Sequence, residues 1–376
     1  MQLLPAAPNV EQSPLVARLA DSLANAGRGA EAAPTYVRAC DGAPDEVAFD
    51  LRRKAAEQWL YTGHIDEGLV VLREVLAGTG EPYPRSPRRA LWGVIRGQVA
   101  LAARGTGYRE QSSAAIARSE IRRLEALWTA TAGVGFTDVI TSAYFSGRYI
   151  LGALRLGELG HVARALGLYA VHTATAGVTR RDKALRLADH ALALAPRLED
   201  PYPRAYAVAI NAVCRFSLGE WRTAHDLCRR AETLLQSECV NVAVELANIR
   251  SLRMAARLLM GDYEPVIAEL PGLLRDAEER GNLYATTAYR SWRTNQVWLA
   301  LDDHELASAH VERADREWSR QGYHQQHLYV LIARSWIDLY AGRAGEALDR
   351  VHREWPAVRR SMLLRLQTYR IELMRI

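Results

Sequence analysis

The 376 residues would suit two ordinary domains or one elongated array, and 49% hydrophobic with 24% charged residues exclude wholesale disorder. The net charge of +5 is carried almost entirely by arginine, because Lys54 and Lys183 are the only lysines, and acidic residues are interleaved with the arginines. A solvated helical face is therefore favoured over a phosphate-binding stripe, and we do not expect nucleic acid as a partner.

The sequence contains no targeting or membrane signal. No run of eighteen or more uncharged apolar residues is present, so neither a membrane span nor a membrane partner is expected. The opening MQLLPAAPNV lacks the basic region and the long apolar core of a signal peptide. The cysteines are scattered without a CxxC pair, which is typical of reduced thiols in a cytoplasmic protein. They are Cys40, Cys214, Cys228 and Cys239.

The first predicted elements are short helices after an irregular lead-in over residues 1–14. Helices are predicted over residues 15–26, 30–40 and 46–62, and a further helix opens at Ile65. Small or apolar residues recur there at three- and four-residue spacing, which gives each helix one apolar face. Gly63 separates the last two helices, and glycine enters the left-handed backbone region of a helix C-terminus without steric cost.

Similar joints between two helices follow along the chain. They are expected at Gly27, Gly105, Gly157, Gly219, Gly261, Asp302 and Gly342. Several intervals between joints, Gly63 included, are 42, 42, 41 and 40 residues, whereas three others are 36, 52 and 62 residues. A helical-hairpin unit that recurs at such a period cannot bury its apolar faces alone, so the units must stack.

The pattern predicts an all-α fold, a tetratricopeptide-like solenoid of helical hairpins wound as a right-handed superhelix. The repeat is about 40 residues, longer than the standard unit of about 34. We expect one helical domain over residues 15–376, with about eight hairpins. Two proline-rich segments, residues 81–87 and 197–204, are expected to be loops that are too short to link domains.

The sequence shows no signature of a catalytic or cofactor site. It lacks the GxxxxGK[ST] loop, a GxGxxG run after a strand, the HRD and DFG runs of kinases, and GxSxG. His324 and His327 are three residues apart, but the nearest acids and histidines do not have the spacing of zinc ligands. We therefore expect no metal, no cofactor and no catalytic residue.

One segment, residues 282–298, is more polar and aromatic than a simple core helix requires. As the first helix of its unit it would line the concave groove, where arginine and tyrosine give flat contacts and hydrogen bonds. Ordinary packing between helices is the alternative. The predicted partner-binding residues are Tyr284, Arg290, Arg293, Asn295, His324, His327 and Tyr329. Replacing Arg290 and Arg293 by alanine is expected to weaken partner binding with little change in melting temperature.

Residues 55–80, 172–177, 261–287, 318–342 and 355–372 carry a resemblance to a known protein region. They resemble the C-terminal tetratricopeptide-like part of large bacterial serine/threonine protein kinases, which are common in myxobacteria. In those proteins a kinase domain and a regulatory ATPase module precede the helical repeats. The resemblance implies a sensing or protein-interaction arm and transfers no catalytic residue. Because kinase and ATPase segments are missing here, the chain is expected to be either an excised fragment or a stand-alone protein.

The leading hypothesis is a cytoplasmic signalling scaffold that binds a peptide or partner protein in its concave groove. A kinase or ATPase module is a candidate partner, in cis or in trans. The alternative is a stand-alone enzyme that reuses the helical scaffold, with an enclosed pocket in residues 136–172. Its candidate polar residues are Asp138, Tyr144, Arg148, Tyr149, His161 and His172.

Overall fold

The computed structural model describes residues 13–135, 137–320 and 322–376, and over this part of the chain it contains helices and no strand. The prediction of an all-α fold built from helical hairpins is therefore confirmed. In the described residues, no helix combines the length and the apolar character that crossing a membrane requires. Residues 1–12 of the predicted lead-in lie outside the described residues, and the first helix already begins at Ser13.

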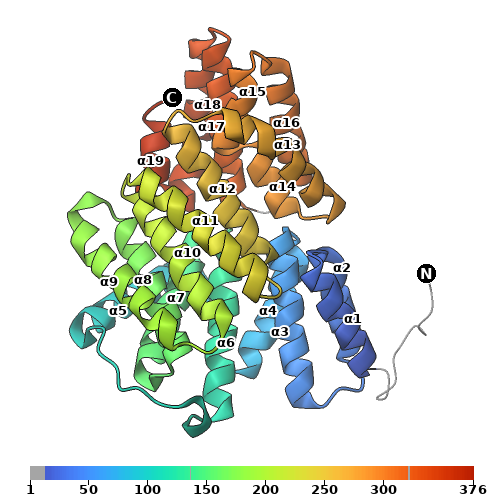
Figure 1. Cartoon of the computed structure of the whole chain (residues 1–376), viewed down its shortest axis with the longest axis vertical. Coiled ribbons are helices and arrows are strands. Elements are labelled where there is room, and N and C mark those ends of the chain that lie inside the picture. Colours follow the sequence, from blue (N-terminus) through green and yellow to red (C-terminus); the bar gives the residue numbers. More distant parts are fainter. Residues whose placement is uncertain (1–12, 136, 321) are drawn as a thin grey trace.

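Most helices follow one another with short connections, and the connector between α5 and α6 is longer (Figure 1). The first half contains α1 (Ser13–Asn25), α2 (Gly29–Ala39), α3 (Asp45–Thr62), α4 (Ile65–Gly78), α5 (Pro87–Arg104), η1 (Ser113–Ala115), α6 (Arg118–Val134), α7 (Val139–Leu156), α8 (Leu159–Ala174), η2 (Val178–Arg180), α9 (Arg181–Leu194) and η3 (Ala195–Arg197). The second half contains α10 (Pro201–Ser217), α11 (Trp221–Glu238), α12 (Ala243–Leu259), α13 (Glu264–Glu279), α14 (Leu283–Arg290), η4 (Trp292–Asn295), α15 (Gln296–Ala300), α16 (His304–Glu317), α17 (Gln325–Tyr340), α18 (Ala344–Ser361), η5 (Leu363–Arg365) and α19 (Gln367–Leu373).

Most of the predicted joints are tight turns between two helices, as expected. At Gly63, φ is 91°, and the backbone N–H of His64 donates to the carbonyl of Trp59, which closes α3. Asp302 adopts a left-handed φ of 60° without being glycine. The other confirmed joints also have positive φ: Gly27, Gly157, Gly219, Gly261 and Gly342.

The joint predicted at Gly105 is wrong. α5 does end there, but the next α-helix begins only at Arg118, after a connector that contains η1. This connector lengthens the interval from Gly105 to Gly157. The still longer interval from Gly157 to Gly219 contains the additional helix α9. The segment 81–87 is a loop up to Ser86, whereas α10 begins at Pro201, inside the second expected loop, since proline is tolerated in a first turn.

The segment 282–298 is not one continuous helix. α14 ends at Arg290, and Trp292 adopts a φ of 52°, a conformation that is uncommon for a residue with a large side chain. The chain then continues through η4 into α15. The Trp292 indole is buried and stacks on the ring of Tyr329 from α17, with ring centroids 5.0 Å apart and planes inclined by 11°. This packing holds the irregular backbone in place.

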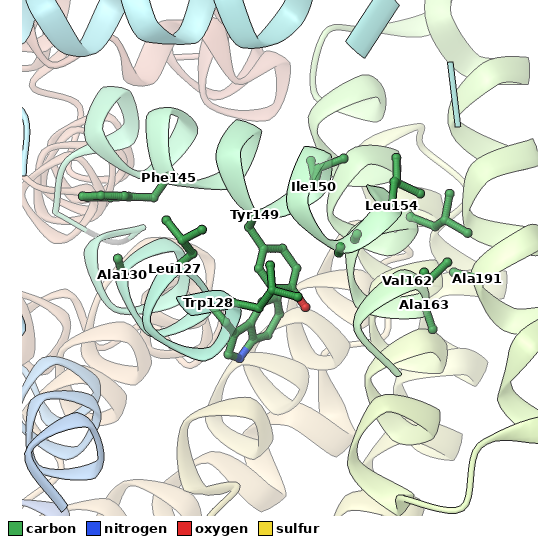
Figure 2. Close-up of a cluster of buried hydrophobic side chains, with 14 of the residues drawn as sticks. Leu127, Trp128, Ala130, Phe145, Tyr149, Ile150, Leu154, Val162, Ala163 and Ala191 are labelled. Carbon is green, nitrogen blue, oxygen red and sulfur yellow. The ribbon is translucent and has the colours of Figure 1, made fainter. Parts of the chain in front are cut away.

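The largest apolar core lies among α3 to α10, with α5 contributing Leu101. Figure 2 shows part of it, with Leu127 and Trp128 of α6 facing Phe145 and Tyr149 of α7. The small residue Ala163 of α8 belongs to the same core, where it lets neighbouring helices approach closely. A second core in the C-terminal half surrounds Trp292. The apolar faces of successive hairpins therefore bury one another.

The array curls so that its first hairpins contact its later ones. The backbone N–H of Asn241 donates to Asn25 Oδ1 at 3.0 Å, and Arg280 donates to the carbonyl of Ala26 at 3.2 Å. Figure 1 shows α3 close to α14. An apolar cluster completes this junction, formed by Tyr61, Ile65, Val244, Tyr284 and Trp318. The N-terminal hairpins thus cover part of the surface that an open solenoid would expose.

Candidate functional site

The predicted partner-binding residues lie inside the packed structure. Six of the seven are buried, and His327 is half-buried. Tyr284 donates to Asn248 Oδ1 of α12 at 2.5 Å, and the Asn295 amide donates to the carbonyls of Arg290 and Ala307 at 3.0 Å each. These bonds join α12, α14, η4 and α16. Their role in this conformation is to fix neighbouring hairpins.

The two arginines of this set form ion pairs inside the C-terminal half. Arg290 is only 1% exposed and pairs with Glu278 of α13 and Glu317 of α16. Arg293 pairs with Glu372 of α19, and both side chains are buried. Burial raises the pKa of Glu372, while Arg293 and Arg375 lower it. Both charges of the Arg293–Glu372 pair are removed from water, so the loss of either side chain would leave the other charge buried without compensation.

The residues from α17 make structural contacts as well. The Trp318 indole N–H donates to His324 Nδ1 at 2.9 Å, and His327 Nδ1 accepts from the backbone N–H of His324 at 2.9 Å. The two histidines thus cap the start of α17. The Tyr329 hydroxyl lies 3.2 Å from that of Tyr369. No cluster of three or more His, Cys, Asp or Glu side chains that could hold a metal occurs in the described part of the chain.

The expectation that these side chains line an open groove is therefore wrong for the six buried ones. Helical spacing does not distinguish an arginine that faces a groove from one paired with carboxylates of neighbouring helices. That these residues bind a partner stays a prediction, and direct contact would require the hairpins to separate.

A different set of polar residues converges from five helices of both halves of the chain. We call it the inner polar cluster. Five of its members are half-buried, and His161 and Arg164 are buried. It consists of Arg53 and Glu57 of α3, Glu125 of α6, His161 and Arg164 of α8, Tyr202 of α10 and Glu245 of α12.

The α3 side of the cluster is joined to α6 by hydrogen bonds. Arg53 forms an ion pair with Glu57 at 2.9 Å, and the side chains are only 15% and 16% exposed. The Thr129 hydroxyl donates to Glu57 at 2.8 Å, and Arg53 Nη1 lies 3.4 Å from that hydroxyl. One guanidinium and one carboxylate are thereby held at the α3–α6 contact.

The centre of the cluster is the carboxylate of Glu125. Arg164 Nη2 donates to it at 2.9 Å, and His161 Nε2 lies 3.3 Å away. Burial alone would raise the pKa of Glu125, but Arg164, His161 and Arg53 lower it to about 2. Burial lowers the pKa of His161 to about 4, with a further contribution from Arg164.

His161 is therefore neutral at neutral pH, and its hydrogen bonds define the tautomer. Its Nδ1 faces two donors, Arg164 Nη2 at 3.1 Å and the Tyr149 hydroxyl at 3.1 Å. Nδ1 thus accepts, and Nε2 carries the proton toward Glu125. The Arg164 guanidinium also lies over the Trp128 ring, 5.2 Å from its centroid.

Glu245 forms the α12 side of the cluster. The Tyr202 hydroxyl donates to Glu245 Oε1 at 2.8 Å. Burial raises the pKa of Glu245 to about 7, although the Tyr202 hydrogen bond opposes that rise, and the negative charge of Glu57 contributes to it. The carboxyl is therefore near its midpoint at neutral pH, so that it accepts hydrogen bonds in one form and donates in the other.

Three polar atoms of the cluster are buried without a hydrogen-bond partner: Arg53 Nε, Arg164 Nε and Glu245 Oε2. A buried polar group without a partner costs about 1–3 kcal/mol, so each would gain from a complementary ligand atom or water. Aromatic rings of Trp128 and Tyr206 adjoin the cluster, with centroids 5.0 Å apart. The arrangement therefore presents donors, an acceptor and flat apolar surface together.

The residues proposed for the enzyme alternative do not converge on one site, although Tyr149 contacts His161 and Arg148 lies over the Tyr144 ring. Asp138 caps the start of α7, and Arg148 pairs with Glu81. His172 lines a pocket between α5, α7 and α8, where its Nε2 lies 2.7 Å from Ser146 Oγ. The acyl-transfer triad needs a third group to orient the histidine, and none is found for His172 in the described residues. Phe136, at the start of the expected region, lies outside these residues.

Sequence reasoning named His161 of this cluster, and Tyr149 that contacts it, but missed the other members. Arg53, Glu57, Glu125 and Glu245 resemble surface charges of amphipathic helices, and only the curvature of the array brings them together. The sequence contains one hint of such a residue, which is a charged side chain placed next to small core residues in the same helix turn. Arg164 is an example, because it lies between the buried Ala163 and Ala165.

The comparisons with known proteins add no family. No family model and no curated protein matches the chain. Among solved structures, it aligns with the crystal structure of a Rap protein complexed with competence and sporulation factor. The identity is 12% and the TM-score 0.45, over 97% of this chain and 93% of that chain. A likeness at this level carries no argument about what this chain binds.

Proposed function

We propose that the protein is a protein-interaction scaffold that binds an extended peptide segment of a partner protein at the inner polar cluster. The observation that carries this proposal is the set of three buried polar atoms without partners, Arg53 Nε, Arg164 Nε and Glu245 Oε2, among half-buried side chains of five helices. A peptide backbone offers both carbonyl acceptors for the two guanidinium N–H groups and N–H donors for the carboxylate.

The surroundings of these atoms favour a peptide over a compact anion. Arg53 and Arg164 already pair with Glu57 and Glu125, so the cluster has no large excess of positive charge. The half-buried rings of Tyr202 and Tyr206, which stack with centroids 6.2 Å apart, supply the flat contact area typical of interaction hot spots. Because the three atoms themselves are buried, a peptide reaches them only when the half-buried side chains around them move aside, while the helices that carry them stay ordered.

The signalling context comes from the sequence resemblance alone. In that context, the scaffold is part of a cytoplasmic signalling protein, and the peptide segment that it binds belongs to a kinase or ATPase module, in cis or in trans. The pairing of charges within the cluster supports a neutral or zwitterionic segment in preference to a strongly acidic one.

A selection from a random peptide library with the full chain tests the proposal. Selected peptides should bind about tenfold more weakly to Glu245→Gln and to Arg53→Gln. Arg230→Gln is the matched control, because Arg230 is an exposed arginine of α11 outside the cluster. Melting temperatures of all variants identify any loss of folding. The proposal fails if no peptide is selected, or if binding is lost in the control and kept in the cluster variants.

A further inference from the structure

A separate pocket of about 450 Å³ lies between α5, α7, α8 and the η2–α9 segment. It is half open, and its walls are mainly apolar. Apolar side chains come from α5 and α7, with Val94, Val99 and Leu101 on one side and Ile150 on the other. The volume lies in the range of pockets that hold small organic molecules.

The loose packing of α5 accounts for the pocket. Within α5 only Ala90 and Leu101 are buried, whereas Val99 is 64% exposed. α5 approaches α7 where Gly97 faces Gly147, so no side chain fills the space beside that contact. Several of the remaining wall positions also carry small residues: Ala102, Ala143 and Ala176. The space is therefore built by small side chains on both walls.

The polar groups of the pocket are neutral or cationic. Ser146 Oγ and His172 Nε2 form a pair 2.7 Å apart, and Lys183 Nζ donates to the Tyr169 hydroxyl at 2.5 Å. Arg180 and Lys183 both line the pocket, and neither forms an ion pair with the described residues. No aspartate or glutamate is among the described lining residues. An apolar space with two cations that have no carboxylate partner among the described residues is complementary to a molecule with an apolar body and an anionic head.

We propose that this pocket binds an amphipathic small molecule with a hydrocarbon body and a carboxylate or phosphate head. The body contacts Val94, Val99 and Ile150, and the head pairs with Arg180 and Lys183. The site does not depend on the peptide proposed for the inner polar cluster, because no residue is shared between the two. Either proposal can therefore fail without the other.

Titration of the full chain with straight-chain carboxylates of increasing length tests the chemistry. Each added methylene should tighten binding about three- to fourfold until the pocket is filled. Alkyl phosphates of equal length should bind as well or better, since the head carries more charge. Primary alcohols of equal length should bind at least about tenfold more weakly, because they cannot pair with the cations.

Matched substitutions test the location. Ala102→Phe should abolish binding by occupying the pocket, whereas Ala103→Phe should not, because both alanines are exposed on α5 and only Ala102 lines the pocket. Lys183→Met should weaken carboxylate binding about tenfold and leave the weak binding of alcohols unchanged. Arg186→Met, an exposed position of the same helix outside the lining, is its control.

The expected pattern is dependence on both chain length and charge, lost in Ala102→Phe and kept in Ala103→Phe. Three results would overturn the proposal. The first is no binding of any carboxylate or phosphate of the series. The second is equal affinity for alcohols and carboxylates. The third is an equal effect of the two alanine substitutions in proteins that melt at the wild-type temperature.

Discussion

Gly63, at the joint between α3 and α4, lies against the indole of Trp318 at the end of α16. A Cβ atom at Gly63 would be 2.8 Å from Trp318 Cζ3 and 3.0 Å from Leu283 Cβ. The glycine therefore meets two requirements, a left-handed turn with φ of 91° and the approach of a distant hairpin. The same residue that ends a local helix also allows the array to curl.

Gly63→Ala should destabilise the protein by about 3 kcal/mol, because the left-handed conformation and the crowding against Trp318 both add a cost. Gly219→Ala is the matched control, since Gly219 has a φ of 83° but nothing within 4 Å of the added Cβ. It should cost only about 1 kcal/mol. Urea unfolding of both variants measures the difference. Equal losses would show that the contact between Gly63 and Trp318 does not constrain the fold.

Arg293→Met should cost about 3–5 kcal/mol, because Glu372 is then left buried without its partner. The double variant Arg293→Met/Glu372→Leu should regain most of that stability, since no buried charge remains. A double-mutant cycle by chemical denaturation gives the coupling free energy. If the losses of unfolding free energy in the two single variants add up to the loss in the double variant, Arg293 and Glu372 are not coupled. The ion pair then does not stabilise the contact between η4 and α19.

Glu245→Gln should change how stability depends on pH. Burial raises the pKa of Glu245 to about 7 in the folded protein, from an ordinary value of 4.5. The folded state therefore binds more protons between these values, and the wild type loses stability as pH rises through this window. The glutamine variant lacks this loss. The free energy of unfolding of the variant relative to the wild type should therefore increase by about 2 kcal/mol from about pH 5 to about pH 8.

Unfolding of wild type and variant at both pH values gives this difference directly. His161 acts in the opposite sense, because its lowered pKa makes stability fall as pH falls below the ordinary 6.5. It is present in both proteins, so its contribution cancels in the comparison. If the free energies of unfolding of wild type and variant depend on pH in the same way across this window, the pKa of Glu245 is not raised in the folded protein.

The hairpin joints could be predicted because glycine, or aspartate at Asp302, signals a left-handed backbone within a few residues. The curl of the array could not, since it depends on contacts such as Asn25 with Asn241 that no local pattern encodes. The break at Trp292 was equally hidden, because a tryptophan with positive φ is held there only by stacking on Tyr329.

The candidate site was harder to predict than the fold, for an electrostatic reason. Arg290 and Arg293 were expected to face a groove, but each is paired with glutamates of other helices. Their joint replacement by alanine, expected from the sequence to leave the melting temperature nearly unchanged, should now lower it markedly. Glu125 and Arg164 show the opposite error. Their charges look solvent-exposed in the sequence, but they form an ion pair within the curled array.

The most direct test of the peptide-binding account is photo-crosslinking with a library-selected peptide. A benzophenone amino acid is placed at Tyr206, half-buried beside the inner polar cluster, or at the exposed Arg230 on α11. The account predicts a crosslink to the peptide from position 206 and none from position 230. A crosslink from position 230 alone, with both proteins folded, would contradict it.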